Sequence, residues 1–95
     1  MYIMSNALIE LLNEINDELT HQISLVKNTA AKINTRKLFQ LSKTLNDIIL
    51  TSEITPINKS MLQKFTLTLQ DSSTAKSLRY EKQDLKRVIS NLKDI

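Results

Sequence analysis

The residues of this chain best suited to chemistry are two carboxylates and the single histidine, Glu14, Asp17 and His21. Their spacing places them one helical turn apart on one face of a helix, which is a possible spacing for metal ligands. Metal sites in helical bundles, however, use ligands that point inward from several helices. These three side chains lie opposite the apolar residues of their segment. We therefore interpret them as a solvated acidic face and predict no bound metal.

The chain lacks the residue sets that catalytic sites usually need. It has one histidine, no cysteine and no glycine, so the usual nucleophile–base pairs and glycine-rich phosphate loops are missing. The absence of cysteine also excludes disulfides and thiolate metal sites, which fits a reducing compartment. We predict no catalytic residues, no cofactor and no enzyme activity, and we expect a binding function instead.

Length and hydropathy favour a small protein that stays in the cytoplasm. Ninety-five residues are enough for one domain with a single core, spanning 1–95. The longest apolar runs are three residues, against the roughly 20 that a membrane-spanning helix needs. The first residues lack the charged and apolar regions of a signal peptide. The sequence leaves open whether Met1 or Met4 is the natural start.

The stretch from Ile54 to Phe65 divides the chain into two arms of similar length. It contains Pro56, the only proline, and proline is tolerated at the first position of a helix because its missing N–H has no intrahelical partner there. Thr55 can accept a hydrogen bond from a free amide of the first turn. The sequence therefore predicts that a helix starts at residue 56.

Apolar residues recur at helical spacing in four segments, and we predict helices over approximately 5–27, 35–51, 56–70 and 78–94. Ser5 or Asn6 can cap the first helix, and Asn34 or Thr35 the second. A polar cluster at 71–74 ends the third. Short connections favour antiparallel neighbours. The prediction is an all-α antiparallel four-helix bundle.

Each predicted helix has an apolar face that we assign to the core. These faces comprise Leu8, Leu11, Leu12, Ile15, Leu19, Ile23 and Val26; Leu38, Leu41, Leu45, Ile48 and Ile49; Ile57, Met61, Leu62, Phe65 and Leu69; and Leu78, Leu85, Val88, Ile89, Leu92 and Ile95. Phe39 and Leu50 widen the second face, which predicts contact with two neighbouring helices. Leu67 points away from its face, and we expect it at the surface.

Positive charge is concentrated in the second arm. Residues 1–47 carry five basic and five acidic side chains, whereas residues 48–95 carry eight and five and so supply the whole net charge of +3. The candidate partner-binding residues lie on the last helix and just before it; they are Lys76, Arg79, Tyr80, Lys82, Lys86 and Lys93. Such a surface suits an acidic protein face or anionic lipid. Nucleic acid binding normally involves a denser basic cluster, so we do not favour it.

The order of these features resembles the immunity proteins of pediocin-like bacteriocins of the enterocin A type. The resemblance covers most of the chain. It is carried by the acidic Leu/Ile-rich stretch 7–19, the Lys/Leu-rich stretch 35–45, the Pro56-Ile57 pair with Met61 and Phe65 behind it, and the Lys-rich stretch 81–89.

The resemblance implies a cytoplasmic four-helix bundle that protects its own cell from a pore-forming peptide. It also implies a partner, the membrane components of the mannose phosphotransferase transporter that serve as bacteriocin receptor, which the immunity protein blocks from the cytoplasmic side. The alternative function is a small helical regulator or adaptor that binds nucleic acid or a partner helix.

Overall fold

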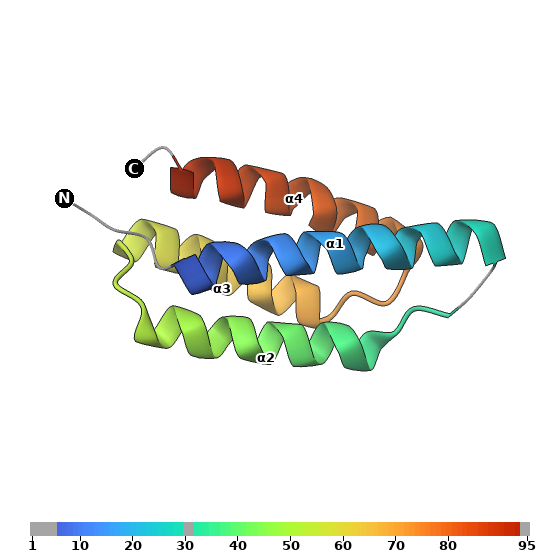
Figure 1. Cartoon of the computed structure of the whole chain (residues 1–95), viewed down its shortest axis with the longest axis horizontal. Helices are drawn as coiled ribbons and strands as arrows, with labels where there is room; N and C mark the ends of the chain where they lie inside the picture. The colour runs from blue at the N-terminus through green and yellow to red at the C-terminus, as the bar shows by residue number, and fades with distance from the viewer. Residues whose placement is uncertain (1–5, 30–31, 94–95) are drawn as a thin grey trace.

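The computed structural model describes residues 6–29 and 32–93, and nearly all of them are helical (Figure 1). The helices are α1 (Asn6–Thr29), α2 (Thr35–Thr51), α3 (Pro56–Gln70) and α4 (Ala75–Lys93). The described residues contain no strand. The predicted all-α class is confirmed, and the predicted bounds of the second and third helices agree with α2 and α3.

The four helices form an antiparallel bundle in which each helix packs against two others (Figure 1). The neighbouring pairs are α1–α2, α2–α3, α3–α4 and α1–α4, and no close backbone contact joins the diagonal pairs within the described residues. The bundle is elongated, with extents of 47 × 22 × 19 Å. The first and last helices therefore lie side by side, and the seam between them closes the bundle.

Polar side chains begin the two middle helices as the sequence predicts. Asn34 Oδ1 accepts a hydrogen bond of 3.0 Å from the amide of Lys37. Thr55 Oγ1 accepts one of 3.3 Å from the amide of Asn58, directly before Pro56. Each cap satisfies an amide that has no partner inside its helix. Ser5, a predicted cap of the first helix, lies outside the described residues.

The start of α4 differs from the prediction. The helix begins at Ala75, three residues before the expected position, because Thr74 and Ser77 cap it reciprocally. Thr74 Oγ1 accepts a hydrogen bond of 3.0 Å from the amide of Ser77, and Ser77 Oγ accepts one of 3.0 Å from the amide of Thr74. This is the geometry of a capping box with serine in place of the usual Glu or Gln.

Two helix ends are completed without glycine. The residue that follows α2, Ser52, is extended with φ −100° and ψ 147°. The residue that follows α3, Asp71, has φ −93° and ψ 0°; its amide donates to the carbonyl oxygen of Leu67, and the amide of Ser72 donates to that of Leu69. Neither position needs the left-handed conformation that makes glycine common at helix ends. The connections are therefore compatible with a chain that contains no glycine.

The core is made almost entirely of leucine and isoleucine, with one phenylalanine. Its buried apolar residues are Leu8, Leu11, Leu12, Ile15, Leu19, Leu38, Leu41, Leu45, Ile49, Leu62, Phe65, Leu69, Leu78, Leu85, Val88 and Leu92. All of them were predicted to be core residues. Ile23, Ile48, Met61 and Ile89 are partly buried against this cluster. Ile95 lies outside the described residues.

One residue assigned to the core, Ile57, is exposed. Ile57 is 82% exposed, because it lies about 120° around α3 from Leu69 and so misses the buried side. Phe39 and Leu50 are also exposed. The helix that carries them contacts two neighbours, α1 and α3, as predicted. Leu67 is exposed, as predicted.

Candidate functional site

The basic side chains of α4 border the seam between α4 and α1. Arg79 and Lys86 are exposed and Lys82 is half-buried. Successive helical residues are rotated by about 100°, so these three lie within about 60° of one another. Lys86 lines a hollow of about 340 Å³ together with Asn16 of α1. The structure therefore brings these three residues into one stripe, which we call the α4 basic stripe.

The remaining predicted residues have different positions. Lys76 is exposed in the first turn of α4, about 60° around the helix from Arg79. The side chain of Lys93 lies outside the described part of the structure. Tyr80 is 61% exposed, but it lies on the α3 side of the helix, about 100° from Arg79. The ring of Tyr80 is thus available to a partner, on a different face from the stripe.

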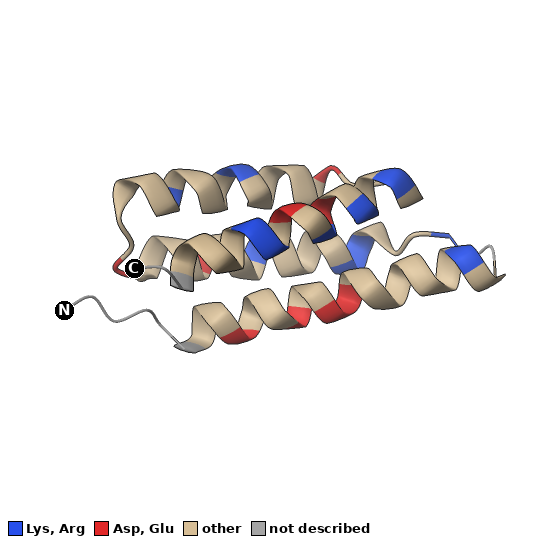
Figure 2. Cartoon of the chain, turned by 90° about the horizontal axis from the view of Figure 1, so that it is seen from above, with Lys and Arg blue, Asp and Glu red and all other residues tan. Residues whose placement is uncertain are grey.

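The electrostatic environment leaves the α4 basic stripe available to an anionic partner. Within the described residues the one ion pair joins Arg87 to Asp84, with a distance of 2.7 Å between Nη2 and Oδ1. The α4 segment has six basic and two acidic residues, whereas α1 has four acidic residues and one basic residue. Figure 2 shows the acidic residues gathered along α1. Arg79, Lys82 and Lys86 repel one another at this spacing, and an anion would relieve that repulsion.

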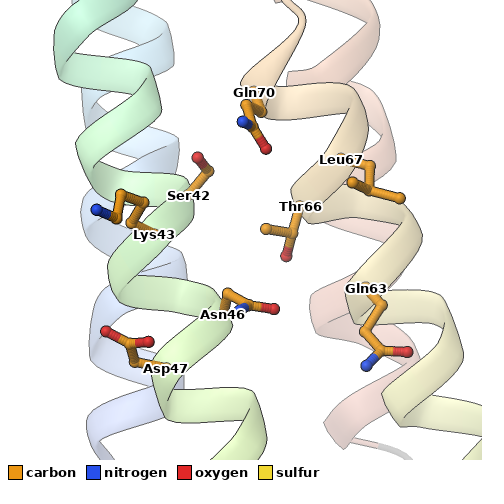
Figure 3. Close-up of a pocket in the computed structure, with 8 residues that line it drawn as sticks. All are labelled: Ser42, Lys43, Asn46, Asp47, Gln63, Thr66, Leu67 and Gln70. Atoms are coloured by element: carbon orange, nitrogen blue, oxygen red, sulfur yellow. The ribbon is translucent and has the colours of Figure 1, made fainter.

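A second surface lies between α2 and α3 (Figure 3). It is a groove of about 420 Å³ lined by residues of both helices. The lining residues are Ser42, Lys43, Asn46, Asp47, Gln63, Thr66, Leu67 and Gln70. The hydroxyl groups of Ser42 and Thr66 donate to carbonyl oxygens of their own helices, at 2.7 and 2.8 Å. Most of the lining residues are polar, but they include no pair of groups set up for acid–base chemistry.

Sequence reasoning missed two polar residues that occupy core positions. Gln22 is buried on α1, where it lies between Leu19 and Val26 at helical spacing. Glu81 is buried on α4, between Leu78 and Leu85. The signal was present in both cases, because a polar residue three or four positions from buried leucines lies on the same face.

Glu81 is the one residue of the described structure whose pKa is clearly shifted. Its Oε2 accepts a hydrogen bond of 3.0 Å from Thr68 Oγ1 of α3. Burial raises the pKa of the Glu81 carboxyl from an ordinary 4.5 to about 7. The hydrogen bond from Thr68 acts in the opposite direction, and the negative charge of Asp84 adds to the rise in pKa. Such a carboxyl can exchange a proton near neutral pH, but it is not open to a substrate.

The acidic residues of α1 do not assemble a metal site. Glu14, Asp17 and His21 are all exposed. No group of three or more His, Cys, Asp or Glu side chains with the geometry to hold a metal ion occurs in the described ranges.

No helix among the described residues is long and apolar enough to cross a membrane. Comparison of the chain with protein families, curated proteins and solved structures finds no match.

Proposed function

We propose that this protein is an immunity protein that protects its cell from a pore-forming, pediocin-like bacteriocin. The observation that carries the proposal is the α4 basic stripe, an unpaired cationic surface on a four-helix bundle of the kind that the sequence resemblance implies. The Pro56 start of α3 and the order of the four segments agree with that resemblance. The function requires binding and no catalysis, which fits the absence of an acid–base or nucleophilic constellation among the described residues.

In this proposal the protein acts in the cytoplasm and its partner is the bacteriocin receptor, the membrane components of the mannose phosphotransferase transporter. Arg79, Lys82 and Lys86 dock on an acidic face of that complex or on the anionic headgroups beside it, with Lys76 and Lys93 extending the basic surface. Near a lipid surface each such group contributes roughly 1 kcal/mol. Tyr80 is available for a second contact on the adjacent face of the helix.

A protection assay tests the proposal. The chain is expressed in a strain sensitive to pediocin-like peptides, and growth is measured over a series of peptide concentrations. We expect the wild type to protect and the triple variant Arg79→Glu, Lys82→Glu, Lys86→Glu to lose protection at equal expression. Helical circular dichroism must show that the variant still folds.

The matched control reverses three basic residues elsewhere, with Arg36→Glu, Lys37→Glu and Lys64→Glu, all at exposed positions. This control should protect as well as the wild type. Equal protection by the α4 variant would show that the α4 basic stripe is only a solvated surface and takes no part in protection. If the wild type protects against no such peptide and the purified protein shifts DNA at physiological salt, the protein is instead a small helical regulator.

A further inference from the structure

Glu81 is the only charged residue among the buried side chains of the described structure. It is 2% exposed, and the other buried polar residues, Gln22, Ser42, Thr66 and Ser72, are neutral. Burying a carboxylate without a cation is costly, and proteins usually avoid the cost by pairing the group or by keeping it protonated. The position of Glu81 therefore makes the α3–α4 seam sensitive to a single proton.

The hydrogen-bond geometry around Thr68 accommodates both protonation states of Glu81. Thr68 Oγ1 lies 3.0 Å from Glu81 Oε2 and 3.0 Å from the carbonyl oxygen of Phe65. A hydroxyl has one hydrogen and can satisfy only one of these acceptors at a time. If the carboxyl is neutral, its own O–H donates to Thr68 Oγ1, and the Thr68 hydroxyl remains free to donate to Phe65. The Thr68–Glu81 hydrogen bond can therefore form in both states, and what separates them is the charge that the carboxylate buries.

The charged groups of α4 and α3 do not neutralise the negative charge that an ionised Glu81 would carry. On α4, Asp84 is one turn away and carries the same charge, and Arg87 is engaged with Asp84. Lys82 follows Glu81 directly, about 100° around the helix and toward α1. On α3, Lys64 and Asp71 are both exposed, four residues before Thr68 and three residues after it.

The other helices supply no counter-charge either. On α1, Glu18 accepts a hydrogen bond from Gln22, and Asp17 and His21 are exposed. The α2 helix makes no close backbone contact with α4 in the described residues. No cation in the described structure forms an ion pair with Glu81. Among residues 6–29 and 32–93, the one hydrogen bond recorded for the Glu81 side chain comes from the neutral hydroxyl of Thr68.

We propose that Thr68 and Glu81 form a proton-controlled latch between α3 and α4. The neutral carboxyl keeps its hydrogen bond to Thr68 without burying a charge, and so holds α4 against α3. Ionisation leaves a desolvated negative charge in the seam beside Asp84, and the charge gains hydration when the first half of α4 separates from α3. The latch is closed in acid and weakens as the pH rises to neutrality.

The direction of the pH dependence follows from proton binding. The folded chain holds the Glu81 proton up to a pKa of about 7, whereas the unfolded chain releases it near the ordinary 4.5. The stabilising contribution is thus complete below about pH 4.5 and is lost as the pH rises through 7. The opening equilibrium should change on the order of 100-fold across that range.

Two measurements on the wild type test the latch. Carboxyl ¹³C NMR should show Glu81 titrating near pH 7. Amide hydrogen exchange, corrected for the intrinsic effect of pH, should show protection falling between about pH 4.5 and 7.5 in the first half of α4 and the end of α3. Protection in α1 and α2 should stay constant. A Glu81 midpoint below pH 5, or an equal loss of protection in all four helices, would overturn the proposal.

Variants separate the latch from general effects of pH. Glu81→Gln cannot ionise and keeps a hydrogen-bonding side chain, so protection of the seam should no longer depend on pH. Thr68→Val removes the hydroxyl that stabilises the carboxylate, so the Glu81 midpoint should rise. Glu14→Gln changes an exposed residue and should behave like the wild type. The latch is wrong if Glu81→Gln retains the wild-type pH profile or if Thr68→Val lowers the midpoint.

Discussion

Gln22 joins α1 to the connection that precedes α2 through three hydrogen bonds. Its Nε2 donates to Glu18 Oε2 at 2.9 Å and to the carbonyl oxygen of Asn34 at 3.3 Å. Its Oε1 accepts from the amide of Asn34 at 3.0 Å. Asn34 also caps α2. One buried side chain thus fixes where the second helix begins relative to the first.

We expect Gln22→Ala to destabilise the protein by about 1–3 kcal/mol, because it removes the partner of the Asn34 amide and one of the two donors to the Asn34 carbonyl oxygen. Urea unfolding followed by circular dichroism measures the difference. Gln83→Ala is the matched control, since Gln83 is exposed on α4, and it should change stability by less than about 0.5 kcal/mol. Equal effects of the two substitutions would show that the Gln22 bonds contribute nothing.

At the residue scale, sequence predicts apolar burial better than it predicts the role of polar residues. Sixteen buried apolar positions follow from helical spacing, because leucine gains stability only on the inner face. Ile57 shows the limit of this rule, since an apolar residue in the first turn of a helix can lie outside the buried face of that helix. Gln22 and Glu81 occupy core positions, but their partners Asn34 and Thr68 come from distant segments and cannot be read from local spacing.

Two leucines on adjacent helices provide a direct test of the packing of α4. Leu85 has no exposed surface and Leu67 of α3 is 64% exposed. Leu85→Ala should cost about 2–5 kcal/mol, because it removes buried methyl groups and leaves a cavity. Leu67→Ala makes the same chemical change at the surface and should stay within about 0.5 kcal/mol. Thermal or urea unfolding of both variants measures the difference, and a small loss for Leu85→Ala would contradict the packing of α4.

At the element scale, helix starts follow the sequence wherever a cap is a single side chain. Asn34 and Thr55 are such caps, and both helices begin where predicted. The start of α4 was placed too late, because Thr74 and Ser77 cap each other and the serine also belongs to the helix. A cluster of hydroxyl residues can therefore form either a loop or a helix cap, and local composition does not distinguish the two.

The closed arrangement of four helices predicts cooperative unfolding. Every described helix contributes to one core cluster, so loss of any helix exposes the apolar faces of two neighbours. At pH 5.5 we expect one transition in which helical circular dichroism and tyrosine fluorescence coincide. The variant Tyr2→Phe leaves Tyr80 as the single fluorophore and reports on α4 alone. A fluorescence change that precedes loss of helix would mean that α4 unfolds separately.

At the scale of the whole molecule, the fold class was predictable and the surfaces were only partly so. The α4 basic stripe is a property of one helix and could be found from spacing. The groove between α2 and α3 was not predicted, because it is formed by residues of two segments that only the fold brings together. The same holds for the hollow shared by Asn16 and Lys86.

The glycine-free connections also affect the unfolded chain. The sequence contains no glycine, so the connections are built from residues whose backbone has a restricted choice of conformations. Ser52 and Asp71 complete helix ends at negative φ, which such residues adopt without strain. A glycine at a position that tolerates a side chain costs about 0.4–1 kcal/mol, chiefly because it widens the unfolded ensemble. Part of the stability of this bundle therefore comes from the conformations that its unfolded chain lacks.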